Sequence, residues 1–554
     1  VLRLVPFLLL PLLIQGFLAI EIRQGFEGSV EVQRAAEYWR SNVATWKDFV
    51  PPEITRIDLR LDLEPSERRM SVAGSYALVN DTQEPMRWLP FTVGSSFGPV
   101  VWSLAGAALA VESRSGLDVL TLPQALAPGA GLRLDFAYDA TYPRGFTRNG
   151  GGAGTFILPA GVLLSTHRGE FLPVPGFVER DERGDKAVPT RPQPARYPDG
   201  SLPATKRARS RRAAAFMTRV EVGLPSEYTA TSVGVKTKEW ASAGRTHTVW
   251  ESDRPVGALN LIAGRWQVRE AGDNAVYFHP GHAVNVETIL ATLVAARSRY
   301  SEWFHPYPWK ELRIAEYPDL ETEATSFPTN ISFSEGIGFL DAAESKSGIA
   351  FSVTAHEVAH QWWGHLLRAA EGPGTGLLVE GLAHYSALLL HEAEHGAASR
   401  IEFARQLERL YLEHRRADER PVLAAEEGRP GDEAALALKG AWVLWMLHNE
   451  LGREPMLAAL RDLVGRHSAS GIEATPEDLL AALTAQADDP TAFRASASQW
   501  LDEIVLPEFA VSGAIVQRTA TGWRAQATVR NVGTGTATVE VGAMGRGELP
   551  GTGG

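Results

Sequence analysis

Two histidines and a glutamate within one five-residue stretch have the types and spacing of a metal-dependent hydrolytic site. The stretch His356-Glu-Val-Ala-His360 separates its histidines by four positions, and residues four apart lie on one face of a helix. Two imidazoles so placed can share a Zn²⁺ ion, and Glu357 can reach water on that ion. The five-letter pattern alone recurs by chance. The apolar pair Val358-Ala359 at its centre and the two tryptophans that follow His360 are typical of a buried helix.

A zinc ion at this stretch needs a third protein ligand, and Glu380 is the candidate. Nineteen residues separate Glu380 from His360, and it lies in the apolar run from Leu377 to Leu390, which indicates a core helix. A carboxylate inside such a helix is costly unless it is paired with a cation or a metal. Pairing with an arginine or lysine is the alternative, and the neighbouring histidine pair favours zinc.

A second copy of the five-letter pattern occurs at His391-Glu-Ala-Glu-His395, and Glu413 lies 17 residues beyond it. Its interior is polar, and Gly396 follows at once, as it does at the end of many helices. We therefore expect a solvated helix end rather than a second metal site.

The run from His356 to His365, followed by a helix that contains Glu380-Gly-Leu-Ala, resembles the gluzincin aminopeptidases of the aminopeptidase N and leukotriene-hydrolase type. The resemblance is closest to the bacterial form fused to the membrane region of an ABC-type permease, and it covers about residues 54–540. It implies a thermolysin-like, mostly helical catalytic domain and a peptide substrate. It also implies one Zn²⁺ on His356, His360 and Glu380, with Glu357 as the catalytic base.

The chain departs from this family at two functional positions. The family places a tyrosine, an oxyanion donor, two residues before a Lys-Gly pair, and here that position is Ala437. Losing one such donor typically costs about 10²–10³ in rate, and Tyr385 and Tyr411 are the candidates to replace it. The family's loop glutamate, which holds the free amine of the substrate, corresponds to Ser326. The resemblance therefore does not imply that this chain selects substrates with a free N-terminus.

The elements that position these residues follow from hydrophobic periodicity. Apolar residues alternate with polar ones from Ile57 to Leu63, as in half-buried strands, whereas from about His279 the pattern is mostly helical. In the resembling family the equivalent of the strand Asn330–Ser334 is an edge strand that pairs with extended peptide. The predicted fold class is multidomain α+β, divided as follows: 1–20, a transmembrane helix or signal anchor; 21–52, a charged helical stalk; 53–268, an N-terminal β-rich domain; 269–507, the zinc metallopeptidase domain; and 508–554, a partial β-sandwich.

The composition excludes several function classes. The net charge of −12 argues against nucleic-acid binding, and the absence of cysteine excludes disulfides, thiolate zinc sites and cysteine nucleophiles. Leu4–Ile20 holds one clearly polar side chain, Gln15, in 17 positions, which is at the short limit for crossing a bilayer of about 30 Å. We expect it to anchor the protein in a membrane, with the catalytic domain outside the cytoplasm; a secretory signal is the alternative.

The sequence thus predicts a membrane-tethered, zinc-dependent metallopeptidase with aminopeptidase-like features. The alternative is a catalytically weak, zinc-binding accessory module of an ABC-type permease, whose partners would be permease or ABC ATPase subunits. Glu357 favours the enzyme, because a merely structural zinc site needs no base, and Ala437 favours the accessory module.

Overall fold

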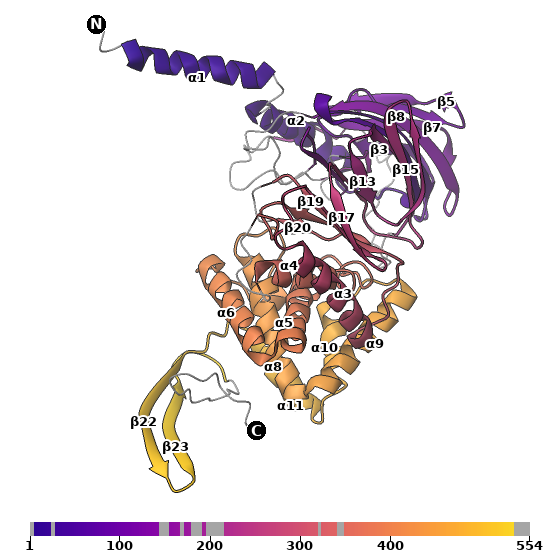
Figure 1. The fold of residues 1–554 in the computed structure, drawn as a ribbon. Helices are drawn as coiled ribbons and strands as arrows, with labels where there is room; N and C mark the ends of the chain where they lie inside the picture. Colours follow the sequence, from indigo (N-terminus) through magenta and orange to yellow (C-terminus); the bar gives the residue numbers. More distant parts are fainter. Residues whose placement is uncertain are drawn as a thin grey trace. The chain divides into compact units, whose positions relative to one another are not determined.

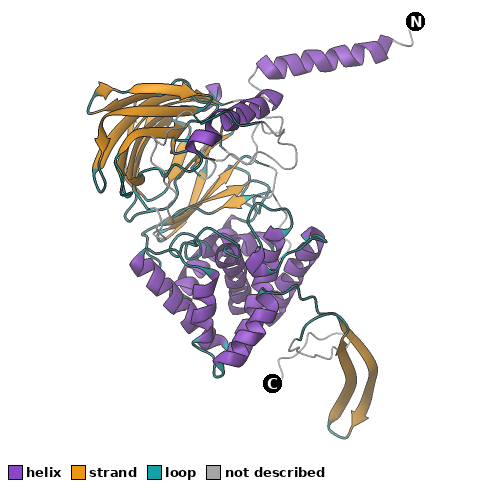
Figure 2. Ribbon diagram, turned by 180° about the vertical axis from the view of Figure 1, so that it is seen from behind, coloured by secondary structure: helices purple, strands orange, loops and turns teal. Residues whose placement is uncertain are grey.

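The computed structural model describes residues 5–23, 28–142, 155–166, 171–178, 191–195, 215–319, 323–340 and 348–536. The chain divides into two compact units (Figure 1). The first comprises Val1–Ala295 and Tyr307–Gln361, and the second comprises Ala296–Pro306 and Trp362–Gly554. Strands predominate in the first unit and helices in the second (Figure 2). The predicted multidomain α+β class, with a β-rich N-terminal part and a helical region after it, is confirmed.

The predicted membrane anchor is wrong. Residues of that segment form helix α1 (Val5–Arg23), which is 19 residues long and contains Pro11. A bilayer crossing requires about 20 predominantly apolar residues, and the apolar run here is 17 positions long and includes Gln15. Among the helices in the described part of the chain, none is both long enough and apolar enough to cross a membrane. The extracytoplasmic location of the catalytic domain was inferred from this anchor, so that prediction is wrong as well.

Helix α2 (Gly28–Trp46) is helical as predicted, but it packs on the β-rich region rather than standing apart as a stalk. Tyr38 and Trp46 are buried on it and pack against Leu117 and Val119. The Tyr38 hydroxyl also lies 2.8 Å from Thr92 Oγ1. The prediction of a stalk was based on the charged residues of this segment. It did not foresee the packing, because two large aromatic residues, Tyr38 and Trp46, determine which face of the helix is buried.

Three sheets form the β-rich region, and alternation of buried and exposed side chains marks its longest strands. In β1, for example, Ile57, Leu59, Leu61 and Leu63 are buried. The eight-stranded sheet has the order β14 (Val235–Ser242), β15 (Arg245–Glu251), β12 (Met217–Pro225), β1 (Glu53–Glu64), β2 (Arg69–Val79), β8 (Gly131–Thr141), β4 (Val101–Leu104), β5 (Ala107–Ala108). The two four-stranded sheets are β13 (Thr229–Ser232), β16 (Asn260–Gly264), β10 (Gly161–Ser165), β9 (Phe156–Ile157), and β11 (Val174–Pro175), β3 (Met86–Thr92), β7 (Leu117–Leu126), β6 (Ala110–Arg114).

A five-stranded sheet precedes the helix with the histidine pair. Its order is β17 (Gln267–Ala271), β18 (Asn274–Phe278), β19 (Leu312–Tyr317), β21 (Asn330–Ser334), β20 (Ala324–Thr325). Strands β18, β19 and β21 run parallel, so their carboxyl ends share one edge of the sheet. Strand β21 is not the outermost strand as the resemblance implied, because β20 pairs with it at Ser332 and Phe333.

The helices follow in chain order, with start signals where the sequence supplies them. Helix α10 begins with a capping box between Thr475 and Asp478, and the side chain of Asp489 caps α11. The bounds are α3 (Val286–Trp303), α4 (Ile349–Ala359), α5 (Leu382–His395), α6 (Ala397–His414), α7 (Asp432–Ala434), α8 (Gly440–Leu451), α9 (Arg453–Ser470), α10 (Pro476–Thr484) and α11 (Pro490–Leu501).

After α11 the chain forms an antiparallel hairpin of β22 (Phe509–Thr519) and β23 (Gly522–Asn531). Nearly all of its side chains are exposed, including Val511 and Trp523. Residues 537–554 of the predicted partial β-sandwich lie outside the described residues. The proposed division into five parts, with a partial β-sandwich at 508–554, stays a prediction.

Candidate metal centre

The histidine pair lies at the end of helix α4, whose sequence explains its burial. Ala355, Val358 and Ala359 are fully buried, and small or branched apolar residues at these positions allow close packing of the helix. His360 is the C-cap residue and keeps a helical backbone, with its N–H donating to His356 O. This geometry holds the two imidazoles one turn apart, with their Nε2 atoms 3.0 Å from each other. Glu357 is 6% exposed on the same helix.

Glu380 lies in a π-helical turn, η3 (Leu377–Gly381), that leads directly into α5. A second π-helical turn, η5 (Ala435–Lys439), leads into α8 and packs against the first. Glycines at the ends of the two turns make this approach possible. A Cβ on Gly381, the last residue of η3, would lie 3.0 Å from Leu436 O, and one on Gly440, which follows η5, would lie 2.8 Å from Leu377 Cδ1. Isolated π-helical turns occur frequently at functional sites. The sequence predicted a plain core helix here and missed both turns.

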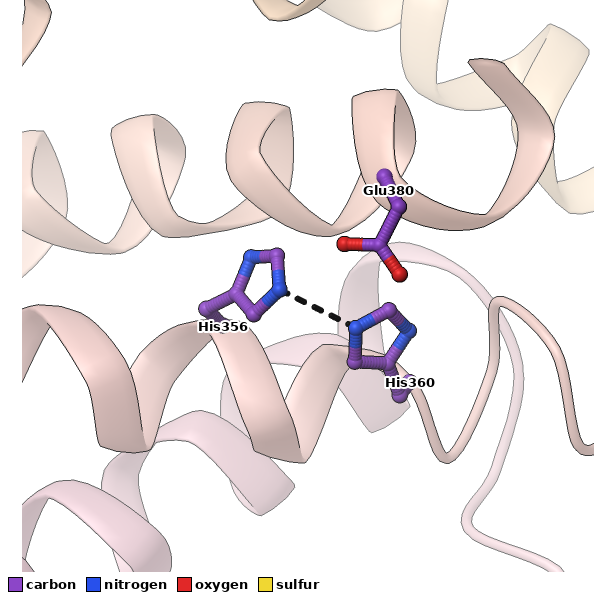
Figure 3. A group of neighbouring side chains, drawn as sticks. All are labelled: His356, His360 and Glu380. Atoms are coloured by element: carbon purple, nitrogen blue, oxygen red, sulfur yellow. Dashed lines mark hydrogen bonds between the residues drawn. The ribbon is translucent and has the colours of Figure 1, made fainter. Parts of the chain in front are cut away.

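The structure brings the three predicted zinc ligands together. One ligand atom each from His356, His360 and Glu380 lies within 4.8 Å of the other two, and the carboxylate of Glu380 points toward the two rings (Figure 3). Ligands about 2.0–2.1 Å from a tetrahedral zinc ion are roughly 3.3 Å apart, close to the observed 3.0 Å between the Nε2 atoms. The donor set of two imidazoles and one carboxylate therefore fits zinc.

Gln361, next to the last histidine, ties the candidate metal helix to the loop that precedes β21. Its Nε2 donates to Ser326 Oγ at 2.8 Å and to Phe327 O at 2.9 Å, and its Oε1 accepts from Thr329 N at 2.9 Å. Gln361 is fully buried. Ser326, the position of the family's amine-holding glutamate, is thus held by an amide. Gln361 was not predicted as a site residue, although it directly follows His360.

Neither tyrosine considered as a replacement oxyanion donor is available. The Tyr385 hydroxyl is buried and lies 2.6 Å from His448 Nδ1, and burial raises the pKa of Tyr385 well above its usual value. Tyr411 donates to Glu419 at 2.7 Å, and that carboxylate also accepts from Lys439 at 3.0 Å. Each hydroxyl is therefore committed to a side chain other than the three candidate ligands.

The second His-Glu-x-x-His stretch does not form part of either group of potential metal ligands found among the described residues. Helix α5 does end at His395 before Gly396, as predicted. His391, however, is buried rather than solvated: it lies 2.9 Å from Ser399 Oγ and stacks on Phe403. Packing against α6, which the sequence pattern did not reveal, covers this histidine.

These buried histidines predict that folding stability falls as the pH falls. Burial lowers the pKa of His448 to about 4 and that of His391 to about 3, whereas unfolded histidine titrates near 6.5. The unfolded chain therefore takes up protons first, so this stability is fully present above about pH 6.5 and is lost toward pH 4. His448 alone accounts for about 1–2 kcal/mol at pH 5.

Thermal melting at pH 7 and pH 5 checks this prediction. The variant His448→Gln, which keeps an acceptor for Tyr385, is expected to show a smaller loss of Tm between the two pH values. An equal loss in the variant and the natural chain would contradict it.

Residues 290–500 match the family described as Peptidase family M1 domain. The rice protein Aminopeptidase M1-B (Oryza sativa subsp. japonica) is 26% identical over 300 residues, which cover 49% of this chain and 33% of that protein. The chain thus spans about a third of the length of this curated relative.

Solved structures share the fold. The M1 zinc metallopeptidase from Deinococcus radiodurans is 19% identical, with a TM-score of 0.61 over 83% of this chain and 96% of that one. A mutant of it bound to a Tyr-Ser-Ala substrate is 20% identical, with a TM-score of 0.59 over the same shares. Residues 290–500 thus match a peptidase family M1 domain, and the solved structures share the fold of this chain.

Proposed function

We propose that this chain is a zinc metallopeptidase that hydrolyses peptide bonds, with His356, His360 and Glu380 as zinc ligands and Glu357 as the catalytic base. The convergence of the three ligand atoms within 4.8 Å carries the proposal. The match of residues 290–500 to a peptidase domain supports it. Zinc, when bound, would supply Lewis acidity that makes water a nucleophile at neutral pH.

The protein's own residues would move the proton. Glu357 follows His356 directly and is held in the buried part of α4. Its carboxylate would accept the proton of the attacking water and deliver it to the leaving amine. Ala437 carries no hydroxyl to stabilise the negative charge that develops on the carbonyl oxygen. We therefore expect kcat to be about 10²–10³-fold lower than at a site with such a donor.

The β20 edge of the five-stranded sheet would hold the substrate. Strand β20 is the outermost strand beside β21, and Ser326 follows it directly. An extended peptide adds readily to such an edge, because main-chain hydrogen bonds form regardless of its sequence. We therefore place the peptide along β20 rather than along β21.

Ser326 predicts weak selection for a free N-terminus. Its hydroxyl is neutral and accepts from Gln361, so it cannot offer an ammonium group the charge-assisted hydrogen bonds of a carboxylate. Peptides with free and blocked N-termini should then be cleaved with kcat/KM values within about tenfold, a difference of roughly 1.4 kcal/mol. Assays of matched free and acetylated peptides measure this ratio, and Ser326→Ala should leave it unchanged. A preference for free N-termini above about a hundredfold would contradict the prediction and point to another acid such as Glu323.

The alternative function, a catalytically weak zinc-binding module associated with an ABC-type permease, rests on Ala437. It predicts zinc binding without measurable peptide cleavage. The same peptide assays separate the two proposals, since the enzyme requires cleavage that depends on Glu357.

A further inference from the structure

A second group of potential metal ligands lies in the first unit, apart from the three residues already described. It consists of His282, Glu316 and Glu335, whose ligand atoms all lie within 4.8 Å of one another. The three residues come from segments far apart in the sequence. None of them was singled out by a sequence motif.

The parallel strands explain why these residues meet. His282 lies in the turn after β18, Glu316 is the penultimate residue of β19, and Glu335 directly follows β21. Since these three strands are parallel neighbours, their carboxyl ends lie at the same edge of the sheet. Side chains at such an edge converge, and this is where α/β sheets commonly bind ligands.

Backbone and side-chain hydrogen bonds hold the three segments in register. Glu335 N donates to Tyr317 O at 2.9 Å, which joins the turn after β21 to the end of β19. Asn285 Nδ2 donates to Gly338 O at 2.7 Å, which joins the turn before α3 to the same region. The group is therefore built into the sheet rather than formed by mobile surface side chains.

The Glu316 carboxylate is buried within this group. The Glu316 side chain is 0% exposed, and its carboxylate accepts from His279 N at 2.6 Å and contacts His282 Nδ1. Glu335 contributes a second carboxylate to the group. Buried carboxylates are costly unless a cation compensates them. One imidazole with two carboxylates is a donor set that suits zinc and other first-row divalent ions.

We propose that His282, Glu316 and Glu335 bind a second divalent cation, of the zinc or first-row transition-metal class, separate from the catalytic zinc. This ion would cross-link the ends of β19 and β21 to the turn before α3. It would thereby fix the sheet whose edge we propose as the peptide-binding strand. The metal site itself does not depend on the proposed peptidase activity.

Metal content of the full chain tests the proposal. After stripping with a chelator and reloading with Zn²⁺ alone, the natural chain should hold two equivalents. Glu316→Gln, which keeps the shape of the side chain, and Glu335→Gln, at the partly exposed ligand, should each lose one equivalent or bind it at least about tenfold more weakly. The matched control Glu287→Gln, an exposed glutamate in the first turn of α3, should keep both equivalents.

Thermal melting of a variant that lacks Glu380 distinguishes this site from the candidate catalytic zinc site. In Glu380→Ala, added Zn²⁺ should still raise the Tm, because an ion that binds the native state stabilises it. The double variant Glu380→Ala/Glu335→Gln should lose this rise. A single equivalent in the natural chain, or two equivalents in both Gln variants of the group, would overturn the proposal and leave His282 and Glu316 as a simple ion pair. Absence of peptidase activity would bear on the proposed function alone.

Discussion

Replacing Glu357 by glutamine is expected to reduce kcat/KM for peptide cleavage at least about 10²-fold while zinc remains bound. The reason is the path of the proton. The attacking water must lose a proton and the leaving amine must gain one, and general acid–base catalysis of this kind contributes about 10²–10⁴ in rate. Glutamine is nearly isosteric with glutamate but cannot accept the proton. Since Glu357 is not among the three converging ligand residues, the metal content should not change.

Parallel measurements on one preparation check this prediction. Zinc content, Tm and kcat/KM are compared for the natural chain, Glu357→Gln and the control Glu408→Gln, an exposed glutamate on α6. Only Glu357→Gln should lose activity, and all three should keep their zinc. Unchanged turnover in Glu357→Gln would refute its assignment as the base.

The candidate zinc ligands could be predicted from sequence because their geometry is mostly local. His356 and His360 are fixed by one turn of a helix, and that turn follows from the apolar residues around them. Glu380 is distant in sequence, but it was the carboxylate in an otherwise apolar run, and burial of a charge is a strong signal. Strand β1 was predicted for the same reason, since apolar and polar residues alternate regularly from Ile57 to Leu63.

Features that depend on contacts between distant segments could not be predicted. The π-helical turn at Glu380 depends on close packing of Gly381 against the turn before α8, and nothing in the local sequence encodes that approach. Strand β20 is only two residues long, too short for periodicity to show. The group of His282, Glu316 and Glu335 is invisible in the sequence, because only the parallel pairing of three strands brings those residues together.

The membrane anchor failed for a different reason. The prediction of an anchor used the hydrophobicity of the segment and its position in the chain. The apolar run of 17 residues is at the short limit for a bilayer crossing. Helix formation by this segment was correctly expected, but a helix with exposed apolar side chains is not by itself a bilayer crossing.

Replacing Glu380 by alanine is expected to remove the catalytic zinc and with it all peptidase activity. Two imidazoles remain in Glu380→Ala, but the only anionic ligand of the group is lost. Changes in residues that merely support a ligand already weaken metal binding about 10–100-fold, so loss of a direct ligand should cost at least about 100-fold. Burial and then the charge of Glu380 raise the pKa of Glu427. A bound zinc ion would therefore also reduce the repulsion between these two carboxylates.

Metal analysis of Glu380→Ala beside His391→Asn decides whether the first or the second His-Glu-x-x-His stretch holds this ion. Glu380→Ala should contain one equivalent less than the natural chain, and His391→Asn should contain the same amount, because His391 is committed to Ser399 and Phe403. Undiminished zinc in Glu380→Ala would remove Glu380 from the ligand set. Loss of an equivalent in His391→Asn would instead assign a zinc ion to the stretch on α5, which its buried and stacked histidine argues against.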